Sequence, residues 1–283
     1  MHIPSLDFFG EGLIIEGRKI VGKAAIIDVD VNQLESTEGI LPSGYVPNPL
    51  HSIPVLTLSS SMSSDFGQQA SILNAGKHSA FLETEVELDD GSTEYHKGTA
   101  FFVSENLLLT AAHNVEPEHG RVTKISIRYE GSKKVEPTGS TLRCRVTAVM
   151  PKIDPSKYDP LEDLAILECF GHDSPHFLHL STDELPPTAT VHVIGYPGEI
   201  TEEWLKARHP ELDDYDGSNR AAAHKLLPQG MLTATEGKIS VVWGGYAEYE
   251  ISTVVGMSGG CLLYNGKVHG TKSDLRNVEI DVV

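Results

Sequence analysis

The chain has 283 residues, of which 40% are hydrophobic, and it carries a formal net charge of −18. Its length is enough to bury a sizeable core. The negative charge argues against nucleic acid and anionic lipid surfaces as partners, because both bind proteins largely through Lys and Arg.

The start of the chain and its cysteines bear on location. Met1–Glu11 lacks the basic and apolar segments of a secretory signal, and no apolar run of about 18 residues is present to cross a membrane. The three cysteines, Cys144, Cys169 and Cys261, cannot all pair internally, which is typical of a reducing compartment. These features favour a cytoplasmic over a secreted location.

Residues 1–77 are predicted to be an N-terminal extension of unknown role. Residues 12–15 and 24–31 have the apolar character of short strands, and the serine-rich run 59–64 is typical of a flexible linker. A pro-segment, an arm that binds a partner and an inert extension are all compatible with this composition.

From Ser79 the pattern changes to short strands separated by turns. The expected strands are 81–88, 98–103, 107–110, 124–129, 142–150 and 164–167. About six antiparallel strands are enough for one β-barrel, which we place at about 78–170.

After a proline-containing connection at 171–189, a second barrel is predicted at about 190–283. Its expected strands are 190–194, 231–243, 246–253, 261–264 and 268–272. An acidic insert at 199–230, parts of which have helical propensity, either shapes substrate access or is an inert surface loop.

Ser258 lies in a glycine-rich turn, residues 255–260 (VGMSGG), between two apolar runs. Gly256 can adopt backbone angles that other residues avoid, which lets the amides of Gly256 and Ser258 point the same way. Two such amides beside a hydroxyl make an oxyanion pocket next to a nucleophile. Because a serine needs a base to take its proton, this prediction requires a histidine and a carboxylate.

Both partners are present upstream. His113 follows the apolar strand at 107–110 on a turn of small residues. Asp159 and Glu162 are candidate carboxylates, but only Asp163 directly precedes the strand at 164–167. The order His, Asp, Ser is the order in which chymotrypsin carries its catalytic residues.

These motifs resemble those of the trypsin/chymotrypsin-like serine proteases over residues 80–272. Residues 193–198 and 249–253 are similar to motifs of the glutamyl-endopeptidase branch. The resemblance implies an all-β fold of two antiparallel six-stranded β-barrels, with residues 78–283 as the protease domain. It also implies a serine endopeptidase that acts on proteins or peptides.

On this resemblance, Ser258 attacks the scissile carbonyl, His113 takes the serine proton, and Asp163 fixes the imidazole tautomer. The amides of Gly256 and Ser258 hold the oxyanion. No metal or other cofactor is implied. The closely spaced His172, His176 and His179 are an unfavourable metal site, because Gly and Pro around them argue against a helix.

The branch recognises an acidic P1 side chain through a threonine and a histidine. Thr253 matches the first, and aligning residues 268–272 places Lys272 where the branch has its histidine. A lysine can pair with a carboxylate as a point charge, so cleavage after Glu or Asp is a hypothesis.

Two features depart from the family pattern. Met257 stands where trypsin-type members carry an aspartate that pairs with a new N-terminus, which predicts no activation of that kind. Only eleven residues follow Lys272, and 276–283 can supply at most one strand. We therefore expect the second barrel to close differently, to be completed by a partner, or to be truncated.

Because the C-terminal segment is short, two alternatives to a serine endopeptidase remain. An incomplete pocket would favour a catalytically weak or inactive scaffold that binds a protein partner, while the triad alone would support an esterase.

Overall fold

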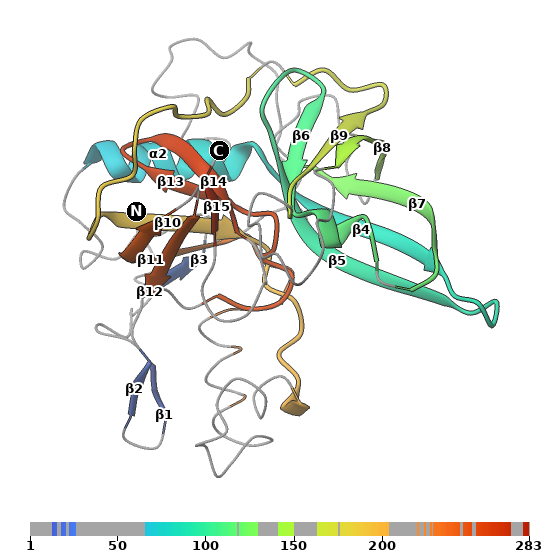
Figure 1. The fold of residues 1–283 in the computed structure, drawn as a ribbon, viewed down its shortest axis with the longest axis horizontal. Helices are drawn as coiled ribbons and strands as arrows, with labels where there is room; N and C mark the ends of the chain where they lie inside the picture. Colours follow the sequence, from blue (N-terminus) through green and yellow to red (C-terminus); the bar gives the residue numbers. More distant parts are fainter. Residues whose placement is uncertain are drawn as a thin grey trace, which may run out of the picture.

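The computed structural model describes residues 13–15, 18–20, 23–26, 66–117, 119–129, 141–149, 163–174, 176–203, 220, 224, 227, 229–243, 246–250, 253–272 and 280–282. Over these residues the chain is mainly β, with two groups of strands side by side (Figure 1). Within this described part, no helix is long and apolar enough to cross a membrane.

The first group is a closed antiparallel barrel with the strand order β4-β5-β6-β9-β8-β7. Its strands are β4 (Ser79–Glu87), β5 (Thr93–Phe102), β6 (Leu107–Thr110), β7 (Arg121–Arg128), β8 (Leu142–Val149) and β9 (Ala165–Cys169). All six expected strands are present, and β5 begins earlier than predicted. Alternating burial in β9 directs Ala165, Leu167 and Cys169 into the barrel core, as expected for a strand with one buried face.

The second group forms a sheet in the order β10-β13-β14-β15-β12-β11-β3, and an additional β10–β11 pairing closes a ring. Its strands are β10 (Thr190–Gly195), β11 (Thr233–Trp243), β12 (Tyr246–Glu250), β13 (Cys261–Tyr264), β14 (Lys267–Lys272) and β15 (Ile280–Val282). The predicted all-β fold with two antiparallel barrels is confirmed.

The short strand β15 decides between the alternatives that the sequence left for the second barrel, because it supplies the single strand allowed in 276–283. Ile280 pairs with both Lys272 on β14 and Ala247 on β12, and Asp281 pairs with both Thr271 and Tyr246. Its three residues bridge the two strands through two pairs with β12 and three with β14. The second barrel therefore closes through β15.

Part of the predicted extension belongs to the same folded unit. The expected strands appear as β1 (Leu13–Ile15) paired with β2 (Arg18–Ile20), and as β3 (Lys23–Ile26) paired with β11. The predicted linker at 59–64 and most of the insert at 199–230 lie outside the described residues.

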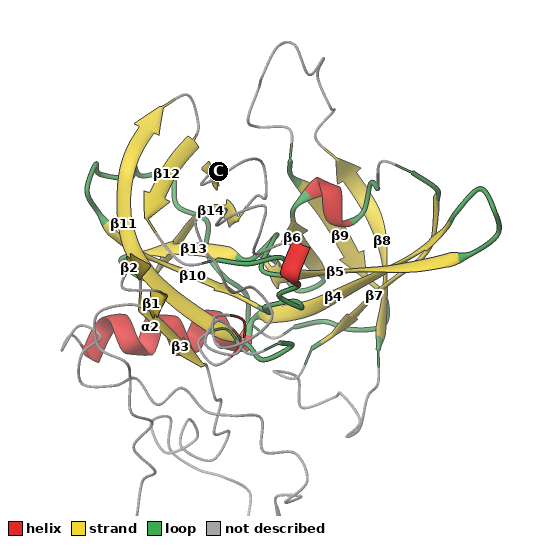
Figure 2. Cartoon of the chain, turned by 90° about the horizontal axis from the view of Figure 1, so that it is seen from below, coloured by secondary structure: helices red, strands yellow, loops and turns green. Residues whose placement is uncertain are grey.

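A helix that the sequence analysis missed, α2 (Phe66–Lys77), lies along the second group of strands (Figure 2). Ile72 and Ala75 are buried in one apolar cluster with Ile194 and Leu263. Few apolar residues in this helix repeat at helical spacing, so the sequence lacks the periodic signal that would have revealed it.

His78 lies buried at the junction of α2 and β4, with 5% of its surface exposed. Its N–H donates to the Ala75 carbonyl at 3.1 Å, and its own carbonyl accepts the Phe102 N–H at 2.9 Å. Burial, together with the nearby His176 and Lys77, lowers the pKa of His78 to about 4, and burial contributes most. The folded protein therefore keeps this imidazole neutral.

We expect His78 to make stability depend on pH. Its pKa falls from 6.5 in the unfolded chain to about 4, so the unfolded state binds more protons between these values and stability falls as pH falls. Between pH 7 and pH 4.5 the loss should be about 2 kcal/mol. Urea unfolding of the protein and His78→Gln at both pH values measures it; equal losses in the two proteins would contradict the assignment.

Candidate active site

The carboxylate of Asp163 holds His113 through both its ring and its backbone. His113 lies in the short 3-10 helix η1 (Ala112–Asn114), directly after β6. Asp163 Oδ2 and Oδ1 lie 2.8 and 3.0 Å from His113 Nδ1, and Oδ1 also accepts the His113 N–H at 2.9 Å. The Asp163 carbonyl accepts the Ala112 N–H at 3.1 Å. The ring orientation is therefore fixed by a buried acceptor, since Asp163 is 5% exposed.

This contact involves one of three carboxylates that the sequence offered. Asp163 immediately precedes β9, as predicted, and so reaches η1 at the end of the neighbouring strand β6. Asp159 and Glu162 lie outside the described residues.

Ser258 lies in the turn that precedes β13, pressed against the first barrel. Gly256 and Gly259 have φ angles of +84° and +82°, a region that disfavours side chains. A Cβ atom on Gly259 would overlap the carbonyl oxygen of Thr99 on β5. The glycines that flank Ser258 are therefore required by backbone conformation and by close packing.

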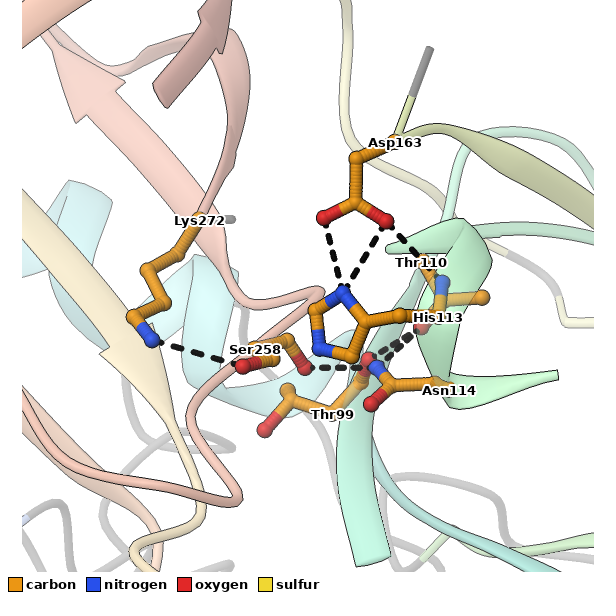
Figure 3. Close-up of polar contacts among 7 residues, drawn as sticks. All are labelled: Thr99, Thr110, His113, Asn114, Asp163, Ser258 and Lys272. Atoms are coloured by element: carbon orange, nitrogen blue, oxygen red, sulfur yellow. Dashed lines mark hydrogen bonds and ion pairs between the residues drawn. The ribbon is translucent and has the colours of Figure 1, made fainter. Parts of the chain in front are cut away.

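Hydrogen bonds cross from the first barrel to the Ser258 loop. The Ser258 carbonyl accepts the Thr99 N–H at 2.8 Å and the Asn114 side-chain amide at 2.9 Å. Thr99 Oγ1 donates to the Gly256 carbonyl at 2.8 Å. Figure 3 shows the His113 ring between the Asp163 carboxylate and Ser258. Asn114 is the neighbour of His113 in the chain, so these bonds fix histidine and serine relative to one another.

The sequence analysis missed Thr99, Thr110 and Asn114 as contributors to this site. Asn114 Nδ2 also donates to Thr110 Oγ1 at 3.0 Å, which in turn donates to the Thr99 carbonyl at 2.7 Å. The one clue in the sequence was that these polar residues lie in or next to strands predicted to be buried, close to His113. Only the packing of the two barrels reveals their common target.

The predicted substrate-binding residues have different surroundings. Lys272, at the end of β14, is 3% exposed, and its Nζ donates to Ser258 Oγ at 3.3 Å. The Thr253 side chain is hydrogen-bonded with the hydroxyl of Tyr249, whose pKa is raised by complete burial. The structure thus brings Lys272 to the serine, whereas Thr253 contacts a residue of the second-barrel core.

Two other residues singled out from the sequence have apolar neighbours. Met257 is fully buried in the core cluster that contains Val193 and Leu262. His172 packs against the rings of Phe102 and Tyr129. Where residues are described, no group of three or more His, Cys, Asp or Glu side chains is arranged to hold a metal ion.

A family model described as the trypsin-like peptidase domain matches residues 98–270, a span that includes His113, Asp163 and Ser258. The chain belongs to this family. It is therefore a peptidase domain, and its family acts on proteins or peptides.

This peptidase is also similar to solved structures of the Rv3671c protease from M. tuberculosis. The active form shares 18% identity with a TM-score of 0.48, over 86% of this chain and 89% of that one. The inactive form shares 17% identity with a TM-score of 0.47, over 78% and 90% of the respective chains. No curated protein matches the chain.

We expect Asn114 to be required for peptidase activity beyond its effect on stability. Asn114→Ala removes a donor to the Ser258 carbonyl, and Asn114→Asp replaces it with an acceptor of the same size. Because a misplacement of about 1 Å can cost about 10²-fold in rate, hydrolysis of labelled casein should fall at least about tenfold in both variants.

The exposed Asn74 on α2 provides the matched control, since Asn74→Ala should leave the rate unchanged. Thermal unfolding of each variant separates lost activity from lost folded protein. Full activity of folded Asn114→Asp would show that this amide does not position the serine.

Proposed function

We propose that this peptidase is a serine endopeptidase in which Ser258, His113 and Asp163 form a catalytic triad. The observation that carries the proposal is the pair of contacts from the Asp163 carboxylate to His113 Nδ1, at 2.8 and 3.0 Å, on a ring whose other side is turned toward Ser258 (Figure 3). An acceptor on Nδ1 favours the tautomer in which Nε2 can take a proton.

In this mechanism the Ser258 Oγ attacks the scissile carbonyl carbon while its proton passes to His113 Nε2. The buried Asp163 stabilises the imidazolium that forms. The amides of Gly256 and Ser258 hold the oxyanion, and a donor of this kind contributes about 3 kcal/mol in the transition state. His113 then gives its proton to the leaving amine, and water releases the acyl group by the reverse proton path.

We also propose that the enzyme prefers an acidic P1 residue, as in the glutamyl-endopeptidase branch. The support is Lys272, a buried ammonium 3.3 Å from the serine oxygen that a bound P1 residue must approach. An ammonium that is poorly hydrated attracts a carboxylate more strongly than one in water. Thr253 is the second proposed contact to the P1 carboxylate, and it would make this contact after its hydroxyl breaks the hydrogen bond with Tyr249.

This proposal treats residues 78–283 as the protease domain and residues 1–77 as an extension. Helix α2 would be the part of the extension that supports the domain, because Ile72 and Ala75 complete an apolar cluster with strands of the second barrel.

We expect a fluorophosphonate probe to label the protein at Ser258 and to leave Ser258→Ala unlabelled. Peptide hydrolysis by the alanine variant should fall ~10⁶-fold in kcat, because the members of a triad act as a unit. Equal labelling of both proteins would contradict the proposed triad. Labelling with ester hydrolysis but no peptide hydrolysis would instead support an esterase, and no labelling would support a non-catalytic scaffold.

We expect Lys272 to set the P1 preference. The parent enzyme should cleave Glu-X peptides faster than otherwise identical Gln-X peptides, and Lys272→Met should remove the difference because it deletes the charge while keeping a long apolar side chain. Values of kcat/KM for the matched peptides measure the preference. Equal values for the parent enzyme would rule out acidic recognition.

A further inference from the structure

The backbone of Lys272 is hydrogen-bonded to the loop that contains Ser258. Its N–H donates to the Gly260 carbonyl at 2.8 Å, and its carbonyl accepts the Gly259 N–H at 2.7 Å. The side chain turns back toward the same loop and places Nζ 3.3 Å from Ser258 Oγ (Figure 3). The backbone bonds fix the Cα atom of Lys272 beside the loop, and burial confines its side chain, since only 3% of the residue is exposed.

An ammonium at this position opposes the attack of Ser258. It stabilises the lone pairs of the hydroxyl oxygen, which become less basic as the oxygen bonds to carbon, so the reactant gains more than the transition state. It also repels the positive charge that forms on His113 when the serine proton arrives. Both effects raise the activation barrier for a substrate that does not draw the Lys272 hydrogen bond away from Ser258.

We propose that Lys272 restrains Ser258 in the free enzyme and that an acidic P1 side chain releases it by drawing the ammonium to the carboxylate. This inference rests on the proposed function and adds a regulatory step to it: the substrate's own charge activates the nucleophile. Lys272 thus acts as a positioning residue before the reaction and as a specificity residue during it.

Lys272 acts in this cycle through its hydrogen bond and transfers no proton. Its hydrogen bond moves from Ser258 Oγ to the substrate carboxylate, the Oγ proton passes to His113 Nε2, and the bond from Oγ to the carbonyl carbon forms. When the scissile C–N bond breaks, His113 gives its proton to the leaving amine. Water then attacks the acyl carbon and gives a proton to His113, the bond from Oγ to the acyl carbon breaks, and His113 returns a proton to Oγ. When the acidic product leaves, Lys272 returns to the serine.

The restraint has a kinetic signature that simple recognition lacks. If Lys272 only bound the P1 carboxylate, Glu would improve binding and lower KM. Release of the nucleophile lowers the barrier after binding, so the advantage of Glu-X over Gln-X peptides should appear in kcat at saturation. This measurement uses the parent enzyme alone and holds even if a lysine variant fails to fold.

The decisive test is the labelling rate with a small uncharged fluorophosphonate, which offers no carboxylate to Lys272. Lys272→Met and Lys272→Gln should react faster than the parent, by about tenfold, which corresponds to about 1.4 kcal/mol. Lys267→Met is the matched control: Lys267 is an exposed lysine at the other end of β14, paired with Asp183 at 2.7 Å, and its loss should leave the rate unchanged.

Equal or slower labelling of the folded Lys272 variants would overturn the restraint, as would a Glu preference confined to KM in the parent enzyme. Neither result would touch the triad, which is tested separately by the loss of labelling in Ser258→Ala. Failure of the restraint and failure of the proposed function are therefore distinguishable.

Discussion

Two hydrogen bonds to the carbonyl oxygen of Ser258 hold the two halves of the site in one geometry. The donors, the Thr99 N–H and the Asn114 amide, both come from the first barrel, whereas Ser258 belongs to the second. Each barrel can position its own residues by sheet pairing, but sheet pairing does not set the distance between barrels. These bonds do so at the serine itself, and Asn114 extends the constraint to the neighbouring His113.

Glycine makes this close approach possible. A Cβ atom on Gly98 would lie 2.5 Å from the side-chain nitrogen of Asn114, and one on Gly259 would overlap Thr99. A side chain at Gly259 would push the Ser258 loop away from β5, and one at Gly98 would displace the Asn114 side chain, so either would break a bond to Ser258. The conformational entropy that glycine loses on folding is thus the cost of a preorganised site.

Charge is distributed unequally around the serine and histidine. Asp163, a buried anion, lies on the far side of the His113 ring, and Lys272, a buried cation, lies beside the Ser258 hydroxyl (Figure 3). The first favours a positive imidazole and the second opposes it. In the proposed mechanism the substrate carboxylate is the third charge at this site, in a chain that is itself strongly acidic.

Local sequence signals were enough to predict most of the strands, through their alternation, and the candidates His113, Asp163 and Ser258, which each lie next to an apolar run. They also predicted the unusual backbone of Gly256, because a tight turn requires it. The fold was needed to show that Asn114 and Thr99 meet Ser258, that α2 packs into an apolar cluster shared by both barrels, and that β15 closes the second barrel. These contacts join residues far apart in the chain, and they depend on how two barrels pack, which local periodicity does not encode.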